Sequence, residues 1–290
     1  MPNKNYKARF KFCDLEDKYS SWDKSRIAIL PVAYDLTASY KSGASAGPKA
    51  IIDASRYMET YDDETGKEIY KFGIYTAKEI KQTGAKPEGI INKVEKEVIS
   101  ILKAGKFPVV LGGEHSITLG PVRACKKIFK NFSVLQLDAH RDMRDSFQGS
   151  KYSHACIAKR IVELTGLSQA GVRSMSKEES GKSNNNLKTF FMKDMVNNMA
   201  WVDEVIDSLD NDRVYVTIDM DAFDPSIMPS VGTPEPGGMG WYETLVLFKR
   251  LSQKKEVIGF DVVELSPMQG NISPDFLAAK VIYKFLNYIF

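Results

Sequence analysis

Hydrophobic residues gather in short unbroken runs that alternate with amphipathic stretches along the chain. Five runs have the length and composition of strands that are buried on both faces of a parallel sheet. They cover residues 27–32, 107–111, 132–137, 214–218 and 257–263. Two weaker strand patterns lie near residues 170–173 and 189–192.

Between these runs, apolar residues recur at every third and fourth position, as on one face of a helix. These amphipathic stretches cover residues 91–102, 119–129, 154–164, 201–209, 241–251 and 276–289. Strands that alternate with helices predict a three-layer α/β fold, with a mostly parallel central sheet covered by helices on both faces. No repeat or low-complexity tract divides the chain, so we expect one domain over residues 1–290, with residues 1–25 as an N-terminal extension.

Three irregular stretches connect the predicted elements. Residues 35–48 and 224–240 each follow a predicted strand directly. Loops beyond the carboxyl ends of parallel strands build the ligand sites of open α/β sheets, so we expect both loops at the site. Residues 174–186 are polar and lie between the two weaker strand patterns, which favours a surface loop.

The composition is that of a folded chain, because 43% of its 290 residues are hydrophobic. The net charge of +3 is spread along the chain, so no nucleic-acid-binding face is expected. The sequence has neither an apolar run of about 18 residues that could span a membrane nor a signal-peptide core, and we expect a cytoplasmic protein. Cys13, Cys125 and Cys156 form no C-x-x-C pair and are interpreted as packing thiols.

Only three histidines occur, and since imidazole is a common metal ligand and acid–base group, their positions are informative. The predicted strand 132–137 is followed by Asp138, His140 and Asp142. Residues two apart on a strand point to the same side, so Asp138 and His140 can converge on one point, with Asp142 turning toward it. This spacing is typical of metal ligands.

Two further strand ends carry similar residues. The run 214–218 leads into Asp219 and Asp221, and the run 107–111 leads into Gly-Gly-Glu-His-Ser, which contains His115. The two glycines would let the backbone approach a ligand closely. Each motif alone is weak evidence, because an Asp-x-Asp after a strand is more often only a turn.

Taken together, these groups predict a binuclear metal site. Carboxylates that are brought together without partners raise one another's pKa, and cations relieve the repulsion. Four aspartates and two neutral histidines carry about four negative charges, which two divalent ions balance; oxygen-rich ligands with histidine favour manganese. Two such ions can activate water for attack on an electrophilic carbon or phosphorus, so the sequence indicates a hydrolase without identifying its substrate.

The motifs resemble, in order and spacing, those of the arginase/agmatinase family, the ureohydrolases. They are GGEHS, LDAHRDMRD followed by Ser153-His154-Ala155, TIDMDAFDPS, GTPEPGG and DVVELSP, and the resemblance covers roughly residues 33–280. The segment 142–154 and the chain length are most similar to bacterial agmatinases. The resemblance implies an arginase-like fold, two Mn²⁺ ions per subunit and a homotrimer or homohexamer.

The family pattern also implies a role for each site residue. One manganese ion would be held by His115, Asp138, Asp142 and Asp219, and the other by Asp138, His140, Asp219 and Asp221. His154 matches the family's proton-shuttling histidine, although a capping or surface histidine is the simpler interpretation without the resemblance. Glu264 matches the glutamate that anchors the guanidinium group, with a strand-end salt bridge as the alternative. Asp142 would pass a proton from the attacking hydroxide to the leaving amine.

The implied activity is hydrolysis of a small cationic guanidino substrate, with agmatine giving putrescine and urea as the leading hypothesis. The alternatives are guanidinobutyrate, aminopropylagmatine, arginine and formiminoglutamate, or a catalytically silent oligomeric family member. Arginine is disfavoured, because the side chains with which arginases bind an α-amino acid head are not recognisable in residues 143–148. The chain departs from the family pattern at Ser45, Ile52, 228–232 and 268–270, and Asp145 is a candidate contact for the distal amine.

Overall fold

A sheet of nine parallel strands forms the middle layer of the computed structural model, which describes residues 10–81, 86–196 and 198–290. The strands are β1 (Ile27–Ala33), β2 (Ile74–Thr76), β3 (Ile80–Lys81), β4 (Phe107–Leu111), β5 (Ser133–Leu137), β6 (Gly166–Val172), β7 (Leu187–Phe191), β8 (Arg213–Asp219) and β9 (Glu256–Val263). Their order is β2-β1-β4-β9-β8-β5-β6-β7, and β3 pairs with β1. All of these strand pairs are parallel.

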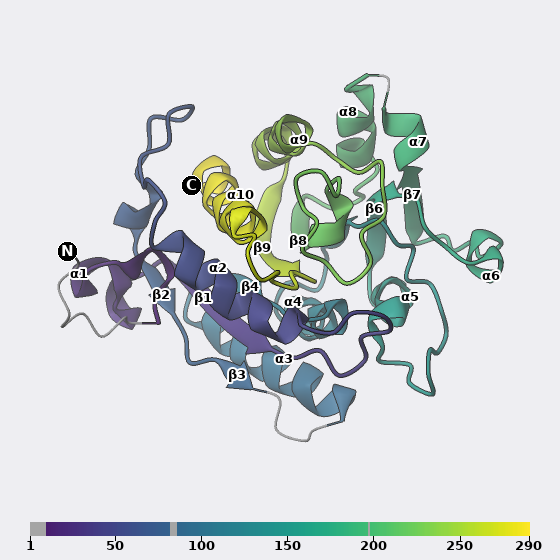
Figure 1. Cartoon of the computed structure of the whole chain (residues 1–290), viewed down its shortest axis with the longest axis horizontal. Helices are drawn as coiled ribbons and strands as arrows, with labels where there is room; N and C mark the ends of the chain where they lie inside the picture. Colours follow the sequence, from purple (N-terminus) through teal and green to yellow (C-terminus); the bar gives the residue numbers. More distant parts are fainter. Residues whose placement is uncertain (1–9, 82–85, 197) are drawn as a thin grey trace.

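Helices cover both faces of the sheet (Figure 1). The α-helices are α1 (Asp17–Ser20), α2 (Gly47–Ser55), α3 (Pro87–Lys103), α4 (Leu119–Phe129), α5 (Ile157–Val162), α6 (Lys177–Ser180), α7 (Met192–Met195), α8 (Ala200–Asp207), α9 (Trp241–Lys254) and α10 (Ser273–Ile289). The short 3₁₀ helices are η1 (Phe12–Asp14), η2 (Trp22–Lys24), η3 (Ala44–Ala46), η4 (Ile69–Phe72), η5 (His115–Thr118), η6 (His154–Cys156) and η7 (Met220–Ala222). Apolar residues of α2, α8, α9 and α10 share one core cluster, and those of α3, α4 and α5 pack on the other face.

The two faces are buried because the central strands are apolar on both sides. Every residue of β5 is buried, as is every residue of β8 after the first. On one face Phe260 of β9 packs against Phe285 of α10, which stacks on Phe248 of α9 with ring centroids 4.1 Å apart. Burying large aromatic side chains in this way contributes strongly to stability. The predicted three-layer α/β fold is thereby confirmed.

The chain order places four strand ends together. The strands β4, β9, β8 and β5 are neighbours in the middle of the sheet, although β8 and β9 come last in the chain. The chain builds β1 and β4, crosses to β5, β6 and β7, and returns to fill the gap with β8 and β9. Ligands of open α/β sheets bind beyond the carboxyl ends of strands at such switch points.

Two local expectations need adjustment, and one helix had no counterpart in the sequence pattern. The predicted helix 154–164 consists of η6 and α5 and ends at Val162. The polar stretch 174–186 contains the short helix α6, whose start carries a capping box between Ser176 and Glu179. The helix α2 follows the irregular loop 35–48 and was not predicted.

The cysteine expectation is confirmed, because Cys13, Cys125 and Cys156 are free thiols, and the last two are buried. None of the helices in the described parts of the chain combines the length and the hydropathy of a membrane-spanning segment.

Candidate active site

Two glycines at the end of β4 let three strand ends approach one another. A Cβ atom on Gly113 would lie 1.8 Å from the carbonyl oxygen of Tyr34, and one on Gly112 would lie 2.6 Å from Val263 Cγ1. The backbone N–H of Glu264 donates to Gly113 O at 2.8 Å. These glycines therefore position the residues that follow β4 and β9, and the close approach of this backbone to a ligand stays a prediction.

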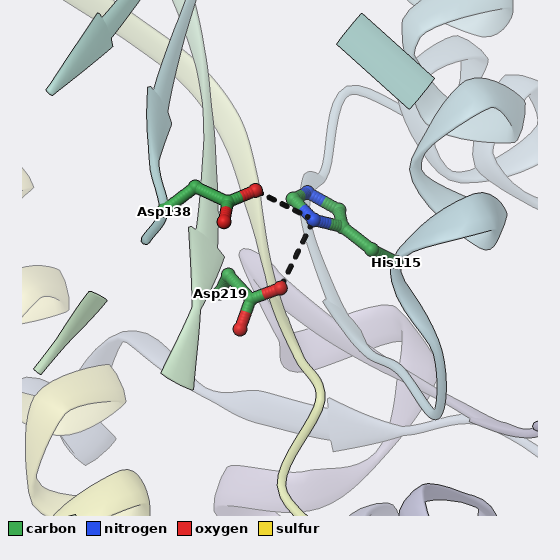
Figure 2. Close-up of side chains that lie close together, drawn as sticks. All are labelled: His115, Asp138 and Asp219. Atoms are coloured by element: carbon green, nitrogen blue, oxygen red, sulfur yellow. Dashed lines mark ion pairs between the residues drawn. The ribbon is translucent and has the colours of Figure 1, made fainter. Parts of the chain in front are cut away.

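His115 lies at the centre of the first cluster (Figure 2). Its Nδ1 atom is 3.1 Å from Asp138 Oδ2 and 3.0 Å from Asp219 Oδ2, and Asp142 Oδ2 lies 3.7 Å away. The His115 side chain is only 1% exposed, and its buried Nδ1 atom has no hydrogen-bond partner among the described residues. A buried imidazole nitrogen that faces several carboxylate oxygens is a donor set for a divalent cation.

His140 forms a second cluster with Asp221 and Asp138. Its Nδ1 atom lies 2.9 Å from Asp221 Oδ2 and 3.6 Å from Asp138 Oδ1. Asp138 is thus common to both clusters, which could each hold a metal ion. Asp219 belongs to the first cluster only, so its predicted bridging position stays a prediction.

The environment of His115 leaves Nδ1 free for a metal ion. Thr217 Oγ1 donates to Asp261 Oδ1 at 2.6 Å and lies 2.9 Å from His115 Nε2. Since the hydroxyl proton of Thr217 is directed at Asp261, its oxygen accepts from Nε2–H. The second oxygen of Asp261 accepts from the Tyr215 hydroxyl at 2.9 Å. Such outer contacts fix the tautomer of metal-binding histidines.

Sequence reasoning missed Thr217 and Asp261, which lie within the runs 214–218 and 257–263. The available signal was Asp261, a carboxylate in the middle of an otherwise apolar strand. Burial raises the pKa of Asp261 to about 6.

The site aspartates are crowded and lack cationic side chains as partners. Within the described ranges, they form ion pairs only with the two imidazoles. Burial raises the pKa of Asp142 well above its usual value, and the charge of Asp138 adds to this. Burial likewise raises the pKa of Asp219, with the charges of Asp221 and Asp138 contributing. Two divalent cations would remove this repulsion, so the donor set fits a binuclear metal site.

Two site residues have a backbone conformation that is uncommon for side chains other than glycine. The φ angle of Asp142 is 50°, and that of Glu264 is 65°. Strained positions of this kind persist when surrounding contacts hold them, and they are concentrated at functional sites. Here the hydrogen bonds from Glu264 N to Gly113 O and from Lys159 N to Asp142 O hold the two turns.

Glu264 faces the same cleft as the metal-binding candidates. Its Oε1 atom accepts from the backbone N–H of His115 at 2.7 Å. Burial raises the pKa of Glu264 to about 8, and the charge of Glu114 adds to the effect. A carboxylate in this position gains stability from a cationic partner, such as a planar guanidinium group.

His154 also faces the cleft and is partly buried. Its ring packs edge to face against Phe147, with ring centroids 5.8 Å apart. Burial lowers the pKa of His154 to about 4, and positive charge on His115 and His140 lowers it further. The imidazole is therefore neutral near pH 7 and can accept a proton.

A narrow cleft brings the predicted residues together. It is lined by His115, His140, Asp142, His154, Asp219, Asp221 and Glu264. Asp138 is fully buried beneath it. The loop 35–48 contributes Ser39 and Tyr40, and the loop 224–240 contributes Gly232 and Thr233, as the sequence predicts.

A second cavity of about 270 Å³ adjoins this cleft. The two share Ser39, His140, Asp142, His154 and Thr233, and the outer cavity extends to Phe147, Met175 and Glu179. Asp145 lines neither cavity: its side chain is 65% exposed and pairs with Lys182 and Lys159. The structure thus does not support Asp145 as a contact for a distal amine.

Comparison with known proteins identifies the same family across nearly the whole chain. A model described as the arginase family matches residues 25–287. An N(1)-aminopropylagmatine ureohydrolase of Synechocystis sp. is 40% identical over 296 residues, covering 99% of this chain and 96% of the relative. An agmatinase of Pyrococcus horikoshii is 39% identical over 260 residues, covering 88% and 89%. The solved agmatine ureohydrolase of Thermoplasma volcanium has a TM-score of 0.85 at 33% identity, covering 97% of this chain and 94% of that structure.

Proposed function

The chain belongs to the arginase family, and the relatives named above are ureohydrolases. We propose that this protein likewise releases urea from the guanidinium end of an agmatine-type substrate. The observation that carries the proposal is the convergence of two metal-binding clusters, Glu264 and His154 on one cleft. The reaction class is hydrolysis of an amidino C–N bond.

The proposed cofactor is a pair of Mn²⁺ ions. One would be held by His115, Asp138, Asp142 and Asp219, and the other by Asp138, His140, Asp219 and Asp221. When bound, such a pair lowers the pKa of a water molecule and supplies a hydroxide near neutral pH. Asp138 lies between both imidazoles, which supports its role as a shared ligand.

The side chains of the protein would orient the substrate and move protons. A guanidinium carbon is a poor electrophile because its positive charge is delocalised, so the group must be held in line with the nucleophile. Glu264 would hold the planar cation by charge-assisted hydrogen bonds. Asp142 would take a proton from the nucleophile and deliver it to the leaving amine, and the neutral His154 would relay protons toward solvent.

We further propose that N1-aminopropylagmatine is a better substrate than agmatine. The relative from Synechocystis carries that name, and its identity extends over almost the whole chain. The outer cavity beyond His154 gives space for the additional aminopropyl group. Arg144 lines this cavity, but its guanidinium lies 3.5 Å from Glu179, so its charge is largely compensated.

The test is urea release by manganese-loaded protein from N1-aminopropylagmatine, agmatine, guanidinobutyrate, arginine and formiminoglutamate. We expect the highest kcat/KM with N1-aminopropylagmatine and activity with agmatine. No urea from any guanidino compound, with two metal ions bound, would rule out the proposed activity. Met175→Trp fills part of the outer cavity and should lower kcat/KM for the longer substrate more than for agmatine; equal losses would contradict the assignment of the cavity.

We propose that the chain assembles into a homotrimer or homohexamer. An apolar groove of about 510 Å³ between α2 and α10 is lined by Ala50, Tyr57 and Phe276, and Tyr57 and Ile272 are 79% exposed. Exposed apolar surface of this kind is typical of subunit contacts. Light scattering coupled to gel filtration measures the mass directly, and a monomer at micromolar concentration would contradict this assembly.

A further inference from the structure

A chain of hydrogen bonds leads from a fully buried carboxylate to His154. Glu114 follows Gly113 and is 0% exposed. Its Oε2 atom accepts from the backbone N–H of Thr37 at 2.5 Å, and its Oε1 atom accepts from the Thr37 hydroxyl at 2.6 Å. Thr37 lies in the loop after β1, and its Oγ1 atom is 3.2 Å from His154 Nδ1.

The direction of these hydrogen bonds fixes which ring nitrogen of His154 carries the proton. A threonine hydroxyl has one proton to donate, and the short contact with Glu114 takes it. At its other side the Thr37 oxygen can only accept, and it accepts from the backbone N–H of His154 at 3.2 Å. His154 therefore donates its Nδ1–H to Thr37 Oγ1. Ser153 Oγ is a more distant neighbour of Nδ1, at 3.4 Å.

The opposite ring nitrogen is then free to accept a proton. A neutral imidazole carries one N–H, so protonation at Nδ1 leaves a lone pair on Nε2. Within residues 10–81, 86–196 and 198–290, no hydrogen bond involves His154 Nε2. The reverse tautomer would break the contact with Thr37, because two lone pairs would face each other.

We propose that Glu114 and Thr37 are positioning residues that hold His154 as its Nδ1–H tautomer and keep Nε2 available as the proton acceptor of the site. This inference rests on the proposed function for the proton-relay role of His154. It assigns a task to Glu114, a buried carboxylate that is neither a predicted metal ligand nor the guanidinium anchor. A carboxylate that orients a catalytic imidazole through a hydrogen bond is a known catalytic device.

The tautomer can be observed directly, because the protein contains only three histidines. Nitrogen-15 spectra of histidine-labelled protein, loaded with diamagnetic Mg²⁺, distinguish Nδ1–H from Nε2–H, and His154→Asn identifies the resonances of His154. We expect Nδ1–H in the unaltered protein and in Thr37→Ser, and a shift toward Nε2–H in Thr37→Val. A wild-type Nε2–H tautomer would overturn the proposal, whether or not the protein releases urea.

Kinetics supply the second readout. We expect Thr37→Val to lower kcat about tenfold with KM changed less than about twofold, and Thr37→Ser to restore most of the loss. On a His154→Asn background, Thr37→Val should have no further effect on kcat, because the two residues act as one unit. A Thr37→Val protein with unchanged kcat and tautomer would contradict the proposal.

A matched control comes from the loop between α2 and η4. Thr65 also donates both its backbone N–H and its hydroxyl to one carboxylate, Asp62 Oδ1, at 2.9 and 3.0 Å. Thr65→Val removes the same kind of hydrogen bond and should leave kcat unchanged. If Thr65→Val lowers kcat as much as Thr37→Val does, the effect is structural and the positioning role is wrong. If His154→Asn leaves kcat unchanged, the relay role in the proposed function fails separately, and the spectra still decide the tautomer.

Discussion

Two acidic clusters in this molecule differ in how the repulsion between their carboxylates is relieved. The first lies on the loop before η4 and contains Asp62 and Glu64, which Lys284 of α10 approaches to 2.9 and 3.1 Å. The second is the group of four aspartates at the carboxyl ends of β5 and β8. Lysines of the chain neutralise Asp62 and Glu64, whereas among the described residues the four aspartates form ion pairs only with imidazoles.

The pKa values follow this difference. The hydroxyl of Tyr288 and the ammonium groups of Lys249 and Lys284 lower the pKa of Glu64 to about 2. For Asp62, burial is outweighed by hydrogen bonds from Thr65 and Lys284, which lower its pKa. At the site, burial and neighbouring carboxylates instead raise the pKa values of Asp142 and Asp219.

The comparison shows that the role of an acidic cluster can be inferred from the groups that neutralise the charge of its carboxylates. Where lysines of the chain balance the negative charge, the cluster needs no added cation and its role is structural. A cluster without such partners has a higher free energy when ionised and gains stability from a cation supplied from outside. Acidic content alone would not distinguish the two.

The largest expected effect comes from Asp138→Asn, because Asp138 belongs to both clusters that could hold a metal ion. We expect urea release to fall by about a thousandfold or more, together with loss of bound metal. Metal content by elemental analysis and urea production in the same sample check this. Retained activity with two ions per chain would show that Asp138 is not a shared ligand.

Asp62→Asn is the matched change in the lysine-paired cluster. It removes one charge from a residue that is 5% exposed, but no metal site depends on it. We expect unchanged metal content and kcat, with a stability loss of about 1–2 kcal/mol from the weakened hydrogen bonds. Loss of metal from Asp62→Asn would remove the distinction between the clusters.

Glu264→Gln should separate substrate binding from metal binding. The amide keeps the shape of the side chain and an acceptor for the His115 N–H, but it has no charge for a guanidinium group. We expect two metal ions to remain bound and kcat/KM to fall about ten- to hundredfold, mainly through KM. Normal substrate affinity in Glu264→Gln would show that another residue holds the guanidinium.

Much of the fold and of the site could be predicted from the sequence, because both depend on strand ends. The apolar runs 132–137 and 214–218 locate β5 and β8, and alternation along a strand places Asp138 and His140 on one side. Spacing alone could not identify His154 and Glu264 because their approach depends on which strands become neighbours. The family resemblance supplied them.

The remaining features depend on contacts between distant segments. Thr37 and Glu114 are separated by 77 positions, and no local pattern indicates that a threonine after β1 bonds a carboxylate after β4. Gly113 could not be recognised as a packing residue, since its close neighbour Tyr34 lies on another strand end. The register of the sheet decides these contacts.

Removing metal should make stability depend on pH. Folded Asp142, Asp219 and Glu264 have raised pKa values, so these three groups bind more protons in the metal-free fold than in the unfolded chain between about pH 4 and pH 8, whereas the lowered pKa of His154 acts in the opposite direction only below about pH 6.5. The stability of the metal-free fold therefore falls as the pH rises through this range. We expect Mn²⁺ to raise the melting temperature of chelator-treated protein by about 5–10 °C at pH 8 and by less at pH 5. An equal rise at both values would contradict the pKa assignment.

The smallest effect on stability is expected from Lys284→Met, which removes the lysine beside Asp62 and Glu64. It is measured on the same metal-free protein. Asp62 and Glu64 have lowered pKa values, so the stability they contribute is present above about pH 4.5 and is lost as the pH falls toward 2. Since solvent screens the pair with Glu64, whose side chain is 36% exposed, Lys284→Met should cost only about 1 kcal/mol at pH 7. Denaturant midpoints should show this difference shrinking between pH 6 and pH 3, opposite to the pH dependence at the site. A difference that stays constant down to pH 3 would mean that Lys284 stabilises the fold through packing of its stem and not through charge. The two clusters would then no longer differ in the way their pKa values indicate.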